Sequence, residues 1–129
     1  MFLNTFDDVL QIFGVICSGS IQPLSCGIWL TYENYTQELK GKIAQFAQDY
    51  QDVIALYRAS FNQSEIAFKN GSIIRFIIAT ENQRGVRFHF SAYDCEIEND
   101  LIYDIIIPKS CVGFRPKSIQ INSKRKEGL

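Results

Sequence analysis

The feature that most constrains the fold is a pair of β-rich runs joined by Asn70-Gly71. Residues 65–78 read EIAFKNGSIIRFII, and apolar side chains recur at alternate positions on both arms. Asn-Gly is the dipeptide that best tolerates the positive φ angles of a two-residue hairpin turn. The segment therefore predicts a β-hairpin, so any fold of this chain has to include antiparallel strand pairing.

Two amphipathic segments predict helices. In residues 5–13 the apolar side chains fall at helical spacing, and Thr5 with Asp8 can form a capping box. Residues 34–50 carry one apolar stripe, which consists of Leu39, Ile43, Phe46, Ala47 and Tyr50. Two glycines and a proline predict a loop over residues 14–25.

Four further segments are predicted to be strands, because they are short and apolar or alternate between apolar and polar residues. They cover residues 27–32, 52–57, 86–93 and 118–122. In the third of them, alternation predicts one shared face for Val86, Phe88, Phe90 and Ala92. Residues 101–107 fit either a helix or a strand, and Pro108 ends that run. The order of elements predicts an α/β fold, with a mostly parallel sheet flanked by helices and an inserted antiparallel hairpin.

The composition fits one globular domain. The chain has 129 residues, of which 47% are hydrophobic and 21% charged, and its formal net charge is -1. Such a chain can bury one core, and its balanced charge gives no overall attraction to nucleic acid or to a membrane. We expect a single domain over residues 1–129, with an N-terminal helix and loop over residues 1–25 and a basic tail over residues 123–129.

The cysteine pattern argues against a thiolate metal site. Cys17, Cys26, Cys95 and Cys111 form no CxxC pair, and the chain has one histidine, His89. Scattered cysteines of this kind are typical of buried small apolar residues in a reducing compartment, which predicts a cytoplasmic protein. His89 falls on the polar side of its predicted strand, so we expect it to be exposed or half-buried on the outer strand face.

Three segments in order resemble the ATPase core of the large terminase subunit of tailed bacteriophages, the motor that packages viral DNA. They are SEIAFKNGSIIRF, RGVRFHFSAYDCE and RPKSIQINSKRKEGL, and the similarity runs from Gly27 to the C-terminus. In that family an Asn-Gly-Ser hairpin precedes an Arg-Gly loop, then a strand that ends in acidic residues, then a coupling strand. The resemblance implies a partial P-loop-ATPase-like core and a role in DNA packaging in the cytoplasm of the infected host cell.

The resemblance also implies a set of site residues. Asp94 takes the place of the carboxylate that holds Mg²⁺, and Glu96 that of the carboxylate that orients the attacking water. On a strand, residues two apart point to the same side, so Asp94 and Glu96 can act together although Cys95 separates them. The remaining nucleotide and coupling positions are Arg84, Gly85, Asn122 and Ser123.

The chain departs from the family in ways that predict no ATP hydrolysis by the isolated domain. No GxxxxGK[ST] occurs, and the glycine-containing residues 14–20 contain no lysine for the β- and γ-phosphates. Lys124 stands where the coupling motif has proline, and the family's nuclease domain is missing. Mg-ATP would bind only if a partner chain supplied the P-loop. The domain is then either a split portion of a packaging motor or a degenerate copy reused for binding.

Two other readings of the sequence remain open. In the first, the chain is a small phage or bacterial protein that binds and inhibits a host protein. The acidic residues that follow the predicted strand over residues 86–93 are then a solvated turn. In the second, it binds nucleic acid through Arg84, Arg87, Arg115 and the tail residues Lys124, Arg125 and Lys126. A crevice lined by Asp94, Glu96, Arg84 and Ser123 would favour the motor reading over the first of these, and binding that falls steeply with added salt would favour the second.

Overall fold

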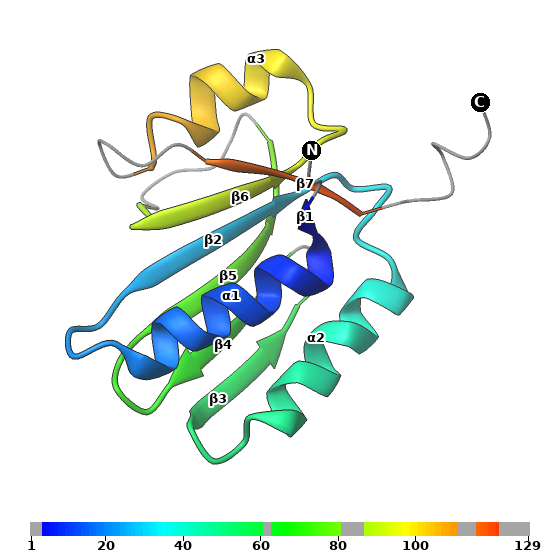
Figure 1. Cartoon of the computed structure of the whole chain (residues 1–129). Coiled ribbons are helices and arrows are strands. Elements are labelled where there is room, and N and C mark those ends of the chain that lie inside the picture. The colour runs from blue at the N-terminus through cyan, green and yellow to red at the C-terminus, as the bar shows by residue number, and fades with distance from the viewer. Residues whose placement is uncertain (1–3, 61–62, 81–86, 111–115, 122–129) are drawn as a thin grey trace.

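A computed structural model describes residues 4–60, 63–80, 87–110 and 116–121 of the chain, and these residues contain one seven-stranded mixed sheet (Figure 1). The strands are β1 (Asn4–Thr5), β2 (Ser25–Leu30), β3 (Ile54–Ala59), β4 (Gln63–Phe68), β5 (Ile73–Ile78), β6 (Phe90–Asp94) and β7 (Lys117–Gln120). Their order across the sheet is β1-β7-β6-β2-β5-β4-β3. The first five strands in this order, β1, β7, β6, β2 and β5, are parallel to one another. β4 runs antiparallel to both β5 and β3. The predicted α/β class, with an inserted hairpin, is confirmed.

Helices cover both faces of the parallel part of the sheet. α1 (Phe6–Gly19) and α2 (Gln37–Asp49) lie along one face, and their buried residues form the larger core with side chains of β2, β4 and β5 (Figure 1). α3 (Asn99–Leu101) continues into a π-helical turn, η1 (Ile102–Ile106), and the two pack on the opposite face. The ambiguous segment over residues 101–107 is therefore helical, and it gives way to a turn before Pro108.

The central strand β2 is buried from both sides. Ile28 and Leu30 point into the core under α1 and α2, whereas Trp29 points into the second core under η1. There the Trp29 ring meets Phe88 edge to face, with the ring centroids 5.8 Å apart. A strand that is covered on both faces has to be apolar at successive positions, and this explains the uninterrupted apolar run in the sequence.

α1 is longer than the sequence predicted. The capping box between Thr5 and Asp8 is present, but the helix continues to Gly19, so the predicted loop over residues 14–25 was wrong for its first part. Gly14 is a packing residue rather than a helix breaker. A β-carbon at Gly14 would lie 2.4 Å from the ring of Phe46, so the glycine lets α2 approach α1 closely.

The hairpin is confirmed, but its turn differs from the predicted two-residue type. Among the described residues other than glycine no φ angle is positive, and Gly71 alone has φ of 92°. The Gly71 amide donates to the carbonyl of Phe68 and the Phe68 amide donates to that of Ser72, which makes a three-residue loop with Gly71 in the left-handed region. Asn70 contributes its side chain instead, which accepts a hydrogen bond from the Ser72 amide.

Several predicted boundaries shift for local reasons. α2 begins at Gln37, not at residue 34, because Thr36 caps it by accepting a hydrogen bond from the Leu39 amide. The predicted alternation over residues 86–93 was wrong at Phe88, which packs in the second core while Phe90 and Ala92 face the first. A bend at His89 separates Phe88 from β6, so the two-residue period does not run through it. Val86 lies outside the described residues.

Candidate functional site

The carboxyl ends of the parallel strands meet at one edge of the sheet, and the candidate site lies at this edge. Asp94 is the last residue of β6, and Thr31 directly follows β2, the neighbouring strand. From β2 the chain crosses through α2 toward β3, whereas from β6 it crosses through α3 and η1 on the opposite face to β7. The gap between β2 and β6 is therefore a topological switch point, the place where open α/β sheets bind their ligands.

Asp94 is completely buried at this point and is held by three donors of its own chain. Its Oδ2 accepts hydrogen bonds from Asn34 Nδ2 at 2.7 Å and from Thr31 Oγ1 at 3.2 Å. Its Oδ1 accepts from the Glu96 amide at 3.0 Å. A buried carboxylate is costly unless hydrogen bonds replace its water, and these three do so. Asp94 thereby fastens the end of β2 to the end of β6.

Asn34 is a site residue that the sequence analysis missed. It is 6% exposed, and its own amide donates to Thr31 Oγ1 at 3.1 Å, so Thr31 links Asn34 and Asp94. The signal for this arrangement was the polar pair three residues apart just after the apolar run of β2. Because residues 34–50 also fit a helix, Asn34 was taken as its first residue and not as a partner for a distant carboxylate.

Glu96 lies in the turn after β6 and not on the strand. Its amide hydrogen bond to Asp94 Oδ1 closes a tight turn, so the two side chains do not share a strand face as predicted. Cys95, between them, is exposed, which corrects the prediction of a buried thiol, and its Sγ donates to Gln120 Oε1 on β7 at 3.5 Å. Cys111 lies outside the described residues.

These residues do not fit a Mg²⁺ ion bound directly to Asp94. Both oxygens of that carboxylate already accept hydrogen bonds, and its side chain has no exposed surface. Within the described part of the chain, no three His, Cys, Asp or Glu residues are grouped so that they could hold a metal ion. The arrangement around Asp94 is that of a structural carboxylate in this conformation.

The start of α1 reaches the same edge of the sheet. Thr5 pairs with Gln120 of β7, and α1 begins at the next residue. The Asp8 amide donates to Thr5 Oγ1 at 3.2 Å, and the Thr5 amide donates to Asp8 Oδ2 at 3.4 Å. Asp7 and Asp8 place two carboxylates in the first helical turn, where they complement the helix dipole and oppose the approach of another anion.

The other predicted site residues cannot be placed relative to this edge. Arg84, Gly85, Asn122 and Ser123 lie outside the described residues, as do Arg115 and the basic tail residues Lys124, Arg125 and Lys126. Arg87 is described and exposed, at the opposite end of β6 from Asp94. His89 is exposed as predicted, and its Nδ1 accepts a hydrogen bond from the Ser25 amide at 3.0 Å.

A second polar contact joins α1 to β2 away from this edge. The Sγ atoms of Cys17 and Cys26 lie 3.6 Å apart, and both side chains are buried, as the sequence analysis predicted for them. The hydrogen bond from Cys26 lowers the pKa of Cys17. The same bond is the main cause that raises the pKa of Cys26, and burial of the thiol is the second cause. At neutral pH the Cys26 thiol therefore keeps its proton.

Comparison with models of known protein families, with curated proteins and with solved structures finds no match to this chain. Among the helices that the structure describes, none has the length and apolar character needed to cross a membrane. The arguments for function therefore rest on the residues of the chain itself.

Proposed function

We propose that this chain is a terminase-like domain of a DNA-packaging assembly that does not hydrolyse ATP on its own. The observation that carries the proposal is Asp94 at the switch point between β2 and β6. The segments that resemble the packaging ATPase supply the hairpin, this strand with its terminal acid, and the parallel strand β7 beside it. The order of these segments along the chain, which is that of the family, thus supports the proposal.

The contacts of Asp94 support the lack of independent activity. Hydrolysis needs a carboxylate that can hold Mg²⁺, through water or directly, and a loop of backbone amides around the phosphates. Here the carboxylate binds Thr31 and Asn34, and the start of α1 is capped by the chain's own Thr5. The domain therefore acts through another protein chain, which would supply the P-loop and open the Asp94 network.

Titration calorimetry with Mg-ATP tests the first part of the proposal. We expect no heat of binding at millimolar nucleotide for the natural chain, and none for Asp94→Asn, which keeps the shape of the buried side chain. Binding by the natural chain that is lost in Asp94→Asn would show a complete nucleotide site and would overturn the proposal.

A second titration tests the need for a partner. The probe is a terminase ATPase segment that carries the strand and the GxxxxGK[ST] loop, added in trans at equimolar concentration. We expect Mg-ATP binding by the mixture that neither component shows alone and that Asp94→Asn abolishes. A mixture in which the segment does not bind this chain would remove the motor reading.

The exposed side of α1 favours one alternative, a protein that binds and inhibits a host protein. Ile12 and Val15 of α1 are 48% and 66% exposed, although a helix exposed on one side normally carries polar residues there. Ile21, two residues after the end of the helix, is fully exposed. Cross-linking from position 15 in host extract tests this reading. One dominant adduct that Ile12→Lys abolishes would support it, and no adduct would leave the packaging role.

A further inference from the structure

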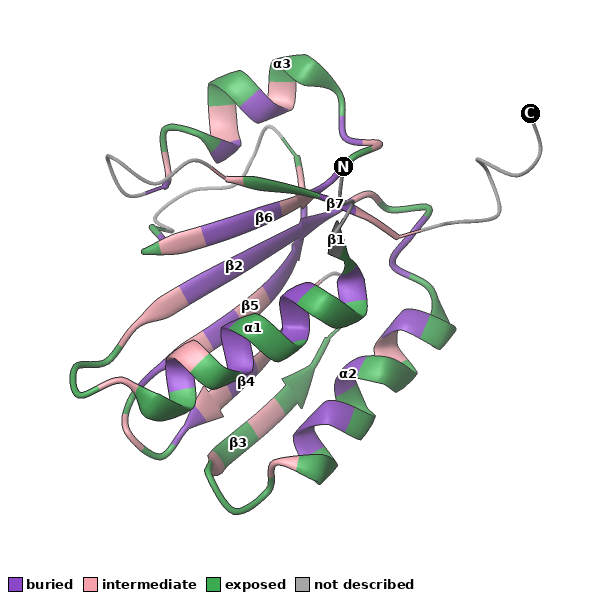
Figure 2. Ribbon diagram, in the orientation of Figure 1, coloured by how far each residue is buried: buried purple, intermediate pink, exposed green. Residues whose placement is uncertain are grey.

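The hairpin end of the sheet has an open edge. β3 is the last strand of the sheet and pairs with β4 on its inner side only, among the residues that the structure describes. The face of this end that lies opposite α2 is not covered by α3 or η1, and β3 is mostly exposed along its length (Figure 2). Leu56 and Arg58 point to this open face, since they pair with Ala67 and Glu65 of β4.

The hydrogen-bond pattern of the hairpin fixes which backbone groups of β3 point outward. The Ser60 amide donates to the carbonyl of Gln63 across the loop, so these two residues form a hydrogen-bonded pair. Bonded and non-bonded pairs alternate along an antiparallel ladder. The backbone groups of Arg58 and Leu56 therefore point to β4, whereas those of Tyr57 and Ala59 point away from the sheet.

The edge has few of the features that keep exposed strands from pairing. β3 reads IALYRA and contains one charged residue, no lysine and no proline. A register shift between Ile54 and Leu56 interrupts its first part, and the rest of the strand is regular. A mostly apolar exposed edge of this kind is a template for another strand.

We infer that β3 pairs with β3 of a second copy of this chain, antiparallel and about a two-fold axis at Tyr57. In this register the outward-pointing Tyr57 backbones form a hydrogen-bonded pair, and Ala55 lies opposite Ala59 of the second copy. Leu56 lies opposite Arg58 of the second copy on the open face. The two sheets then form one continuous sheet with both hairpin ends buried at its centre.

Charge and side-chain direction argue against two other registers. An axis at Arg58 would set the two arginines directly opposite each other, which is destabilising. A shift by one residue would place the open-face side chains of one copy opposite the core-facing side chains of the other. An axis at Tyr57 avoids both problems and covers Leu56, which is 43% exposed in the single chain.

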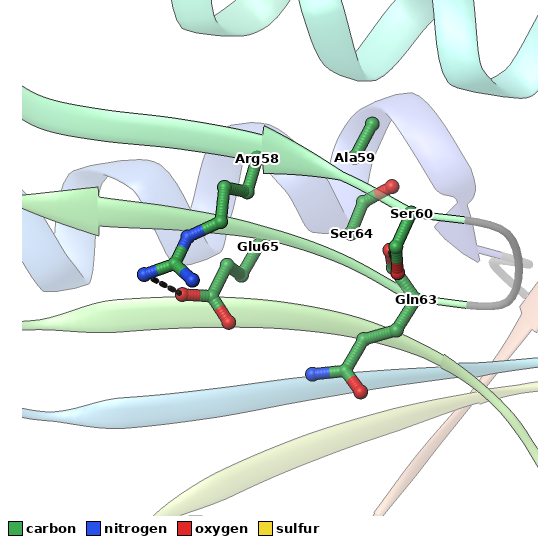
Figure 3. A pocket seen from close by; sticks show the side chains of 6 residues that line it. All are labelled: Arg58, Ala59, Ser60, Gln63, Ser64 and Glu65. Carbon is green, nitrogen blue, oxygen red and sulfur yellow. Dashed lines mark hydrogen bonds and ion pairs between the residues drawn. The ribbon is translucent and has the colours of Figure 1, made fainter.

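Arg58 is suited to this contact because its charge is already partly balanced within its own chain. It lies 3.8 Å from Glu65 (Figure 3). Glu65 also pairs with Arg75 at 3.8 Å. A hollow of about 240 Å³ beside Arg58 and Glu65 leaves space around the arginine. Its apolar stem can therefore lie over Leu56 of the second copy while the guanidinium stays with Glu65.

The helices leave room for the pairing. A two-fold axis through the sheet brings the two α2 helices to the same side. Lys42 of α2 pairs with Asp7 of α1, so this side of α2 faces α1 of the same chain and not the second copy. Ala44, which is exposed, lies on roughly the opposite side of the helix. Lys40 lies one turn earlier on the same side, and its Nζ is held 4.7 Å from the centre of the Tyr35 ring of its own chain. The two α2 helices therefore face each other across the side that carries Ala44, where the Lys40 amine is turned toward Tyr35 of its own chain.

Analytical ultracentrifugation over a concentration series that extends to millimolar chain tests the inference. We expect a reversible dimer that Leu56→Lys weakens by at least about tenfold, because two symmetry-related pairs each gain a like charge. Leu56→Glu is the matched control, since it exposes a charge at the same place but sets it opposite Arg58, and it keeps or strengthens the dimer. Circular dichroism shows that each variant is folded.

A backbone variant separates edge pairing from contact between faces. Ala59→Pro removes an outward-pointing N–H and no bond to β4, so the monomer folds while the dimer is lost. A chain that stays monomeric at every concentration overturns the inference. So does a dimer that ignores both Leu56→Lys and Ala59→Pro, or one that Val15→Lys on α1 dissociates instead.

Discussion

The two ends of the sheet differ in whether helices cover one face of their strands or both. β2, in the parallel part, is covered by α1 on one face and by η1 on the other, and five of its six residues are buried. β4, in the hairpin, alternates between buried and half-buried residues, and β3 beside it has no buried residue. The polar network around Asp94 lies at the doubly covered end, where water is excluded. Covering both faces thus creates the conditions for a buried site, and covering one face leaves a surface for association.

Truncating a buried side chain of β2 should have the largest effect. Trp29→Ala should lower the free energy of unfolding by about 3–5 kcal/mol, because it empties the second core against Phe88. Leu56→Ala at the hairpin end should cost less than about 1 kcal/mol. Urea unfolding followed by circular dichroism measures both. Tryptophan fluorescence would not serve, because Trp29 is the sole tryptophan of the chain and one of the variants removes it. Equal costs for the two variants would contradict the distinction between the two ends.

Removing the buried carboxylate should have the next largest effect. Asp94→Ala leaves the Asn34 amide and the Thr31 hydroxyl without their acceptor, and we expect a loss of about 2–4 kcal/mol. Asp94→Asn keeps an oxygen in place and should cost about half as much. Glu98→Ala, at an exposed position with no capping hydrogen bond, is the control and should change stability by less than about 0.5 kcal/mol. A loss in Asp94→Ala no larger than this control would mean that the network contributes little.

The turn of the hairpin should respond to a side chain at Gly71. Gly71→Ala forces a β-carbon into a φ of 92° and toward Pro23, and we expect a cost of about 1–2 kcal/mol. The same substitution at Gly41, in the exposed interior of α2 with open space around it, should stabilise the protein by about 0.5–1 kcal/mol. Thermal unfolding of the two variants should therefore shift in opposite directions, and a shared direction would count against the left-handed turn.

The ion pairs of the open face should contribute least to the stability of the monomer. The Arg58 side chain is 69% exposed and lies 3.8 Å from Glu65, so Arg58→Ala should change the free energy of unfolding by less than about 0.5 kcal/mol. The measurement is made in dilute solution, where the chain is monomeric. A cost above about 1 kcal/mol would show that charges, and not packing under α2, hold the hairpin end.

Local patterns in the sequence predicted the elements better than their partners. The hairpin, the α2 stripe and the capping box of α1 depend on neighbouring residues, and all three are present. The tail of α1 was missed because Gly14 looks like a helix breaker until Phe46 is seen against it. The π-helical turn after α3 left no signal that separates it from a strand.

Much of the candidate site was beyond sequence reasoning for a related reason. Asp94 was identified from its place at the end of a strand, but its partner Asn34 is 60 residues earlier in the chain. Only the parallel pairing of β2 with β6 brings them together. Glu96 was expected to act beside Asp94, and the turn that its own amide makes prevents a shared strand face.

The hairpin loop has a consequence for the order in which the molecule assembles. Asn70 Nδ2 donates to the carbonyl of Cys17 at 2.6 Å and to that of Ser20 at 3.2 Å, so it binds acceptors at the end of α1. These contacts span 53 and 50 residues of the chain. During synthesis, the first helix can acquire its final bonds only after the ribosome has released the hairpin. The last turn of α1 and the tip of the hairpin should therefore become protected from hydrogen exchange together.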